Sequence, residues 1–316
     1  MPARARGGNA PERPRSGARR NVDHPPGGRG LSTPRAFAET LFDGYRQELR
    51  VERVYLERNT DLQSLLIFHN RCFGRVMVLD GIVQTTEGDE FIYHEMLAHV
   101  PLFAHGTARR VLVVGGGDGG MLREVLRHRE VERAVQVEVD SAVIDMCREH
   151  LPNHSAGAFD DPRVEIVIAD GARFVSETRE RFDVIISDST DPVGPGTALF
   201  RPEFHAACRR CLSPGGVLVT QNGVAFLQPE VARNSARSFS RTFRDWHFFS
   251  AAVPTYAGGV MLFGWATDDP ALREVPVETI RERYAPSGIR TRYYNPEVHV
   301  ASFALPQYVR ELVGKD

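Results

Sequence analysis

Glycines and acidic residues next to predicted strands are the residues of this sequence best suited to chemistry. The segment VLVVGGGDGG, residues 111–120, runs from an apolar strand through a glycine-rich turn into a helix. Gly115, Gly117 and Gly120 fit the spacing GxGxxG, which lets backbone approach a ligand at a helix N-terminus. Glu138 ends the next predicted strand, where a carboxylate can hold a ribose diol. This combination predicts a nucleoside-binding site.

Asp118 lies inside the glycine-rich turn and narrows the type of ligand. A carboxylate there repels phosphate groups, which disfavours NAD and ATP, and attracts a cation instead. A ligand with both a nucleoside and a positive charge is S-adenosylmethionine or a relative of it. The alternative for Asp118 is a helix-capping role, which is compatible with ligand binding.

A second acidic motif is IVIADGARF, residues 166–174, in which a strand ends at Asp170 and Gly171. A carboxylate at this edge of the sheet can accept a hydrogen bond from the amino group of adenine. A turn or helix cap is the alternative for Asp170. The motif follows the strand after Glu138, which favours the ligand interpretation.

The third motif is FDVIISDSTDPVGPG, residues 182–196, in which Asp188 and Asp191 follow a buried strand. Together with Asp118 they would form an acidic pocket, which is costly unless a cation fills it. A divalent metal shared by the two aspartates and a loop of aspartate turns are the alternatives. The proline and glycine residues at 192–196 suit a lid that orders over a substrate.

Polar side chains in two further segments are expected near the same site. Gln84, Tyr93 and His94 lie between the predicted small domain and the predicted large domain, and clefts between domains are common ligand sites. Tyr256 lies in a turn, PTYAGG, before an edge strand and carries little weight by itself.

Two sets of elements must position these residues. Up to about Glu90 the pattern predicts a small antiparallel β domain followed by a helix over residues 91–103. From Arg109 onward strands alternate with helices, which predicts a parallel sheet covered on both faces. An antiparallel hairpin at the sheet edge completes the prediction. The expected strands are 49–56, 62–68, 75–79 and 82–86 in the small domain, 111–114, 134–139, 164–169, 182–187 and 217–221 in the parallel sheet, and 248–253 with 259–265 in the hairpin.

Composition limits the class of protein. The chain has 316 residues, and 39 basic against 41 acidic residues argue against a nucleic-acid partner. The sequence has no apolar run long enough for a membrane span and no secretory signal, and four cysteines are too few for a disulfide framework, so a cytoplasmic protein is expected. Residues 1–35 hold eight arginines, six prolines and six glycines and are predicted to be a disordered tail.

The sequence resembles the spermidine synthases, the polyamine aminopropyltransferases, and is close to the enterobacterial type. The resemblance extends from about Phe37 to Tyr308 and rests on long segments, not on a single motif. These segments are FGRVMVLDGIVQTTEGDEFIYHEMLAHVPL, VLVVGGGDGGMLREVLRH, FDVIISDSTDPVGPG, CLSPGGVLVTQNG, VPTYAGGVML and YYNPEVHVASFALPQY. One departure is Phe37, where relatives often have Trp.

The resemblance implies an N-terminal antiparallel β domain, residues 36–90, joined to a Rossmann-like domain of the methyltransferase type, residues 91–316. It implies transfer of an aminopropyl group from decarboxylated S-adenosylmethionine to putrescine, giving spermidine and methylthioadenosine. The decarboxylated compound would be a co-substrate, with no further cofactor and no metal. A homodimer or homotetramer is expected.

The resemblance also assigns roles to individual residues. It implies that Asp188 is the proton acceptor. The expected contacts to the amine and the aminopropyl group come from Gln84, Tyr93, His94, Asp118, Asp188, Asp191 and Tyr256. The expected contacts to the nucleoside come from Gln63, Glu138, Asp170, Gly171 and Pro195.

Several alternatives remain open at this point. Spermidine, agmatine or cadaverine could replace putrescine as the acceptor, since pocket length decides the choice. A methyltransferase would bind S-adenosylmethionine with its carboxylate, which would meet the like charge of Asp118. A polyamine sensor would keep the acidic residues but would need neither a base nor an adenosine pocket.

Overall fold

The computed structural model describes residues 35–192 and 194–315. The predicted disordered tail, residues 1–35, lies outside the described residues except for Arg35. None of the helices that the structure describes is long and apolar enough to cross a membrane.

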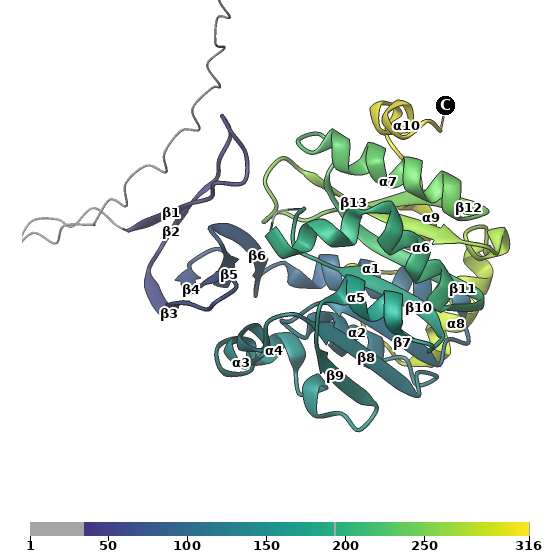
Figure 1. Cartoon of the computed structure of the whole chain (residues 1–316), viewed down its shortest axis with the longest axis horizontal. Coiled ribbons are helices and arrows are strands. Elements are labelled where there is room, and N and C mark those ends of the chain that lie inside the picture. The colour runs from purple at the N-terminus through teal and green to yellow at the C-terminus, as the bar shows by residue number, and fades with distance from the viewer. Residues whose placement is uncertain (1–34, 193, 316) are drawn as a thin grey trace, which may run out of the picture. The chain divides into compact units, whose positions relative to one another are not determined.

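The N-terminal sheet is antiparallel, as predicted, and joins strands that are consecutive in the chain (Figure 1). Its strands are β3 (Arg53–Asn59), β4 (Ser64–Asn70), β5 (Gly74–Leu79) and β6 (Ile82–Thr86). A separate ribbon pairs β1 (Ala36–Ala38) with β2 (Glu48–Arg50).

The single strand predicted over residues 49–56 is wrong, because the chain changes its pairing partner within it. The backbone N–H of Val51 donates to the carbonyl oxygen of Arg35, next to β1, at 2.8 Å. The N–H of Glu52 donates to the carbonyl oxygen of His69 in β4 at 3.0 Å. Periodicity alone cannot reveal such a switch, since both halves have extended backbone.

The larger sheet has, within the described residues, the strand order β12-β13-β11-β10-β7-β8-β9. The strands β11, β10, β7, β8 and β9 pair in parallel, and β13 is antiparallel to both of its neighbours. This order is that of the Rossmann-like, methyltransferase-type sheet, and the predicted edge hairpin is confirmed. The strands are β7 (Arg110–Gly115), β8 (Arg133–Glu138), β9 (Val164–Ile168), β10 (Phe182–Asp188), β11 (Leu212–Val224), β12 (Asp245–Ala252) and β13 (Val260–Thr267).

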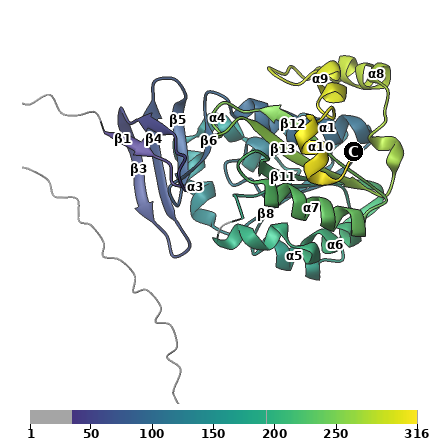
Figure 2. The same cartoon turned by 90° about the horizontal axis from the view of Figure 1, so that it is seen from above.

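Helices cover both faces of the larger sheet (Figure 2). One face packs against α1 (Glu90–His105), α2 (Gly120–Leu126), α8 (Val277–Ser287) and α9 (Pro296–Ala301). The other face packs against α5 (Gly171–Glu177), α6 (Pro202–Cys211), α7 (Pro229–Thr242) and α10 (Gln307–Val313). The C-terminal helices α8, α9 and α10 were not predicted from the sequence.

The strand before the glycine-rich turn shows why its sequence is apolar without alternation. Val111 and Val113 are buried against one helical layer, while Leu112 and Val114 are buried against the other. A strand that is covered on both faces needs apolar residues at every position. The end of β7 is therefore fixed firmly, together with the turn that follows it.

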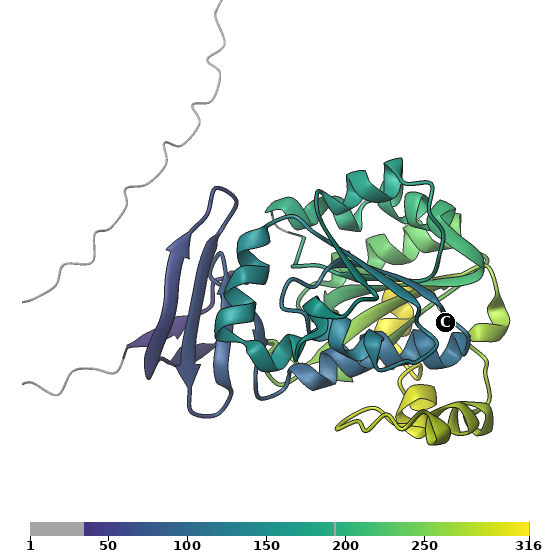
Figure 3. The ribbon, with the colours of Figure 1, turned by 90° about the horizontal axis from the view of Figure 1, so that it is seen from below.

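Helix α3 (Ser141–His150) packs against the N-terminal sheet (Figure 3). Its Val143, Met146 and Cys147 share a buried cluster with Leu65 of β4 and Met77 of β5. Because α3 follows β8 directly, this packing brings the N-terminal sheet to the edge at which β8 ends. The short helix α4 (Pro152–Ser155) follows α3.

Candidate active site

A cavity lies where the ends of β7, β8 and β10 meet residues of the N-terminal sheet. All predicted site residues whose side chains the structure describes line it: Gln63, Gln84, Tyr93, His94, Asp118, Glu138, Asp170, Gly171, Asp188, Asp191 and Tyr256. Pro195 lies in the 3₁₀ helix η2 (Gly194–Phe200), but its side chain is outside the described residues. Among the described residues that line the cavity there are several acids and no Lys or Arg.

The glycine-rich turn packs closely against the end of β10. Gly115 has φ +87°, and a Cβ there would lie 2.1 Å from the carbonyl oxygen of Asp188. The N–H of Gly116 donates to that same oxygen at 3.0 Å. From the other side, the Gln136 side-chain amide donates to the carbonyl oxygens of Gly115 and Gly116, at 2.9 and 2.6 Å. Only glycine allows this close approach.

Glu138 is held at the C-terminal end of β8. Its Oε1 accepts hydrogen bonds from the N–H groups of Val139 and Asp140, at 2.8 and 3.0 Å. A Cβ on Gly117 would lie 2.9 Å from Oε2, so this oxygen faces the glycine-rich turn. Burial raises the pKa of Glu138 to about 7, despite the two backbone hydrogen bonds that lower it.

Asp170 caps helix α5, because its Oδ1 accepts a hydrogen bond from the N–H of Arg173 at 2.8 Å. The capping alternative from the sequence therefore holds, and the residue also lines the cavity. The next residue, Gly171, leaves no room for a side chain, since a Cβ would lie 2.3 Å from Cγ1 of Val114.

Gln63 comes from the β3–β4 hairpin and reaches the larger domain. Its Nε2 donates to Oδ2 of Asp140 at 3.0 Å. Asp140 in turn caps α3, because its Oδ1 accepts from the N–H of Ala142. Gln63 thus lines the cavity and also fastens the hairpin to the helix behind it.

Asp118 and His94 form a buried pair. His94 Nε2 lies 3.4 Å from Oδ2 of Asp118, whose Oδ1 accepts from the N–H of Gly120 at 2.7 Å. The N-cap of α2 is Gly119, so Asp118 binds the first turn of the helix from one position earlier. Burial opposes ionisation of both groups, but their mutual attraction lowers the pKa of Asp118 and, with Glu90, raises the pKa of His94.

Asp188 ends β10 and accepts a hydrogen bond from Tyr93. The phenol oxygen of Tyr93 lies 2.8 Å from Oδ1 of Asp188. Burial raises the pKa of Asp188 to about 6; Asp118 adds to this shift, while His94 and Tyr93 oppose it. A carboxyl group with a raised pKa in a cavity is a candidate general base.

Asp191 and Tyr256 also line the cavity. Gln228 Nε2 donates to Oδ1 of Asp191 at 2.5 Å, and burial raises the pKa of Asp191. The phenol of Tyr256 donates to the carbonyl oxygen of Gln84 at 2.7 Å, which joins the edge hairpin to the N-terminal sheet. Among residues 35–192 and 194–315, no group of three His, Cys, Asp or Glu is arranged to hold a metal ion.

Sequence reasoning missed several polar residues at the cavity. Gln221 donates to the carbonyl oxygens of Ser189 and Thr190 and thereby supports the loop between Asp188 and Asp191. Gln228 binds Asp191, and Glu39 accepts from the N–H of Val83. Gln221 is the last residue of the predicted strand 217–221, a polar residue at the carboxyl end of an apolar run, and this signal would have identified it. Glu39 and Gln228 gave no such signal.

Two family comparisons cover most of the described chain. Residues 90–276 match the spermine/spermidine synthase domain, and residues 36–87 match the spermidine synthase tetramerisation domain. Polyamine aminopropyltransferase 1 from Pseudomonas aeruginosa is 60% identical over 279 residues, which are 88% of this chain and 98% of that protein. The polyamine aminopropyltransferase of Escherichia coli O1:K1 is 56% identical over 284 residues, 90% of this chain and 99% of the relative.

Solved structures agree with these relatives. A spermidine synthase in complex with the transition-state analogue AdoDATO has a TM-score of 0.84 at 41% identity, covering 89% of this chain and 97% of that one. Spermidine synthase from Thermotoga maritima has a TM-score of 0.82 at 39% identity, covering 90% and 96%. The fold, the two matched domains and these relatives show that the chain belongs to the spermine/spermidine synthase family.

Proposed function

We propose that this protein is a spermidine synthase. It transfers the aminopropyl group of decarboxylated S-adenosylmethionine to putrescine and releases spermidine and methylthioadenosine. The observation that carries the proposal is the cavity itself. It joins the glycine-rich turn to a set of buried acids, and the described residues that line it include no Lys or Arg.

The charge of the cavity matches these two substrates. Putrescine is a dication at neutral pH, and the donor carries a sulfonium and an ammonium group, because primary amines have pKa values of about 10. Buried carboxylates are costly unless cations compensate them. Asp118 would bind the ammonium group of the donor, and Asp188 and Asp191 would bind the acceptor amine.

The attacking amine must lose a proton before it can react. The sulfonium leaves as a neutral thioether, so the leaving group needs no acid. Asp188 is the proposed proton acceptor, since burial raises its pKa to about 6 and Tyr93 holds its carboxylate in place. A base of this pKa removes a proton more effectively near neutral pH than an ordinary aspartate does.

The remaining residues would orient the substrates. On the nucleoside side, Glu138 would bind the ribose hydroxyls and Asp170 and Gly171 the adenine, while Gln63 and Pro195 would also contact the nucleoside. On the amine side, Gln84, Tyr93, His94 and Tyr256 would line the channel. Alignment of the attacking nitrogen, the carbon and the sulfur can lower the activation free energy by roughly 7–11 kcal/mol.

Selection of the donor would follow from Asp118. S-adenosylmethionine itself carries a carboxylate beside its amino group, and that carboxylate would meet the buried charge of Asp118. The decarboxylated donor lacks the clash and keeps the ammonium group. A methyltransferase reaction, which uses the intact compound, is therefore disfavoured.

The chain is also proposed to assemble with copies of itself into a dimer or tetramer. The proposal is supported by residues 36–87, which match the spermidine synthase tetramerisation domain. Light scattering on the purified protein would give the mass of the assembly. A species of single-chain mass would contradict the proposal.

The test of the activity is formation of methylthioadenosine from decarboxylated S-adenosylmethionine. We expect formation only when putrescine is added, with spermidine appearing in equal amount. The control replaces the donor with intact S-adenosylmethionine, for which no transfer to putrescine is expected. Methylation of putrescine in that control, without aminopropyl transfer in the test, would overturn the proposed function.

A further inference from the structure

His94 lies between two carboxylates that belong to different elements. Its Nδ1 is 2.6 Å from Oε2 of Glu90, one turn earlier in α1, and its Nε2 is 3.4 Å from Oδ2 of Asp118. Its side chain is only 3% exposed. Glu90 is not among the residues that line the cavity, whereas His94 and Asp118 are.

The hydrogen-bonding capacity of these groups fixes the protonation of the ring. An ionised carboxylate only accepts hydrogen bonds, so a ring nitrogen that faces one must carry a proton. Glu90 is ionised, because Arg123 Nη2 donates to its Oε2 at 2.7 Å, and burial does not prevent His94 and Arg123 from lowering the pKa of Glu90 to about 2. With a carboxylate at each nitrogen, His94 is an imidazolium in the free protein.

The other groups that face His94 fit this charge. They are Tyr93 on the same helix, Asp188 at the end of β10 and His154 on α4, whereas Arg123 on α2 binds the Glu90 carboxylate. The ring of His154 lies 6.4 Å from that of His94, and burial lowers the pKa of His154, which leaves it neutral. His94 is therefore the cation next to Asp118 when no ligand is bound.

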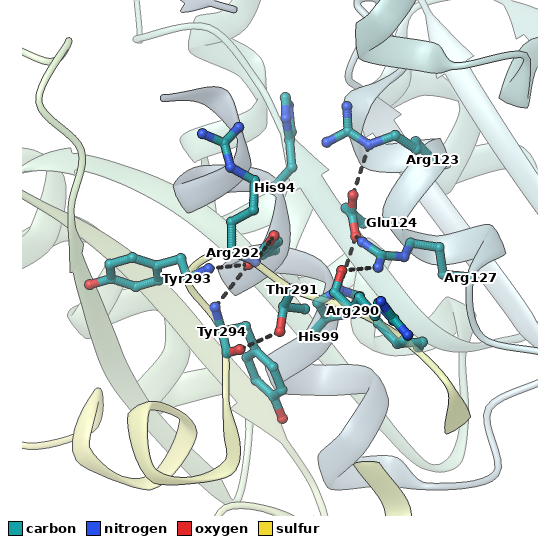
Figure 4. A network of polar contacts seen from close by, with 12 residues as sticks. His94, His99, Arg123, Glu124, Arg127, Arg290, Thr291, Arg292, Tyr293 and Tyr294 are labelled. Carbon is teal, nitrogen blue, oxygen red and sulfur yellow. Dashed lines mark hydrogen bonds and ion pairs between the residues drawn. The ribbon is translucent and has the colours of Figure 1, made fainter. Parts of the chain in front are cut away.

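A network of ion pairs holds the carboxylate of Glu90 in place independently of His94. Arg123, which binds Glu90, also donates to Glu124 at 2.7 Å, and Glu124 is bound by Arg127 and by buried His99. Figure 4 shows Arg123, Arg127 and His99 gathered around Glu124. The Glu90 carboxylate is thus anchored from behind, and its hydrogen bond to Nδ1 does not depend on what occupies the cavity.

We propose that Glu90 is a positioning residue that keeps one proton on Nδ1 of His94, so that Nε2 donates to Asp118 in the free protein and, once deprotonated, accepts a hydrogen bond from the ammonium group of the bound donor. This inference rests on the proposed function. The ammonium takes the place of the imidazolium as the partner of Asp118. The Nε2 proton passes to solvent, and the net charge beside Asp118 is unchanged.

Donor binding is then coupled to the release of about one proton per site. The proton comes from the protein, because the donor ammonium, with a pKa of about 10, enters already charged. Methylthioadenosine, which has the nucleoside and no ammonium, releases none from His94. Donor affinity rises with pH by about tenfold per pH unit while one proton is released.

Proton release is measured by calorimetry in two buffers of different ionisation enthalpy, with the intact protein and no acceptor. A pH of about 8 keeps Asp188 ionised, since its pKa is about 6. The ligands are decarboxylated S-adenosylmethionine and methylthioadenosine. We expect release of about one proton with the first and of far less with the second. Equal release with both ligands would overturn the inference.

Two variants separate His94 from other sources of the proton. His94→Gln should bind the donor without proton release. Glu90→Gln should lower the release and weaken donor binding about tenfold to hundredfold, because the new amide can donate to Nδ1 and favour the wrong tautomer. Its affinity for methylthioadenosine should stay near that of the natural protein. The matched control is Glu130→Gln, an exposed residue outside the ion pairs that the structure describes.

The failures of the inference and of the proposed function are distinguishable. If either variant releases as many protons as the natural protein, the inference is wrong even when the protein makes spermidine. If the natural protein makes no spermidine and does not bind the donor, the proposed function fails. If Glu90→Gln does not fold, His94→Gln and the comparison of the two ligands decide the matter.

Discussion

The phenol hydroxyl of Tyr93 donates a hydrogen bond to Oδ1 of Asp188 at 2.8 Å and thereby links helix α1 to the end of β10. Tyr93 is buried, and burial raises its pKa well above the usual value, so it keeps its proton and stays a hydrogen-bond donor near neutral pH. The hydrogen bond lowers the pKa of Asp188, against the larger effect of burial. Tyr93 therefore both aims the proposed base and limits its basicity.

The pH dependence of the reaction rate should reveal the effect of the hydrogen bond between Tyr93 and Asp188. Asp188 has to be ionised to accept a proton, so kcat/KM for putrescine, measured at saturating donor so that donor binding does not contribute, should fall as the pH drops below about 6. Tyr93→Phe removes a hydrogen bond that favours the ionised form, and the acid limb of the profile should move up by about one pH unit. Steady-state rates over a range of pH give the shift. A shift to lower pH would contradict the role of Tyr93.

Replacement of the base should affect turnover more than binding. Asp188→Asn keeps the shape of the side chain and removes its ability to accept a proton, so kcat should fall by roughly 10²–10⁴-fold. Methylthioadenosine binding, followed by calorimetry, should change little. Asp145→Asn, at an exposed position of α3, is the control and should retain full activity. Near-normal turnover in Asp188→Asn would exclude Asp188 as the base.

The substitution Asp188→Asn should also stabilise the folded protein above about pH 6. An unfolded aspartate has a pKa of about 3.9, whereas folding raises the pKa of Asp188 to about 6. The folded protein therefore loses stability as the pH rises from about 4 to about 6, and the deficit persists above that range. Asp188→Asn should be more stable than the natural protein by roughly 1–3 kcal/mol at about pH 8, and no more stable at about pH 4. Urea unfolding at both pH values tests the sign; a loss of stability at pH 8 would contradict it.

Asp118 should control the choice of donor. Asp118→Asn removes the charge that pairs with an ammonium group, so the KM for decarboxylated S-adenosylmethionine should rise about tenfold to hundredfold. The preference over intact S-adenosylmethionine, measured as a ratio of dissociation constants, should shrink. Equal affinity of the natural protein for the two compounds would show that Asp118 does not discriminate between them.

Gly171 should tolerate no side chain. A Cβ there would lie 2.3 Å from Cγ1 of Val114, so Gly171→Ala should cost about 1–3 kcal/mol of stability and weaken nucleoside binding. Val114→Ala removes the colliding methyl group, and the double variant should regain part of the loss. Thermal unfolding and methylthioadenosine binding provide the two measurements. Additive losses in the double variant would show that the clash is not the cause.

The alternation of strands and helices made the fold predictable from the sequence. An apolar strand such as Val111–Val114, covered on both faces, has a pattern that leaves few choices. The switch of pairing partner at Val51 and Glu52 was not predictable, because it depends on which distant strand each backbone group meets. The C-terminal helices α8–α10 carry weak patterns and were missed.

The sequence likewise predicts some residues of the candidate site and not others. Residues that follow strands, such as Asp118, Glu138 and Asp188, could be placed together from topology, because the carboxyl ends of parallel strands share one edge. Glu90 could not be found in this way, since its importance lies in a contact with His94 one helical turn away and with Arg123 on another helix. Residues such as Gln228 and Glu39 reach the cavity through contacts that only the folded chain creates.

The most direct test of the account is a competition among acceptors. The purified protein is mixed with decarboxylated S-adenosylmethionine that carries an isotope-labelled aminopropyl group and with equal amounts of unlabelled putrescine, cadaverine, agmatine and spermidine, and the labelled products are identified by mass spectrometry. The account predicts labelled spermidine as the dominant product, together with an equal amount of methylthioadenosine. Absence of any labelled aminopropylated amine, from a protein that still binds methylthioadenosine, would contradict it.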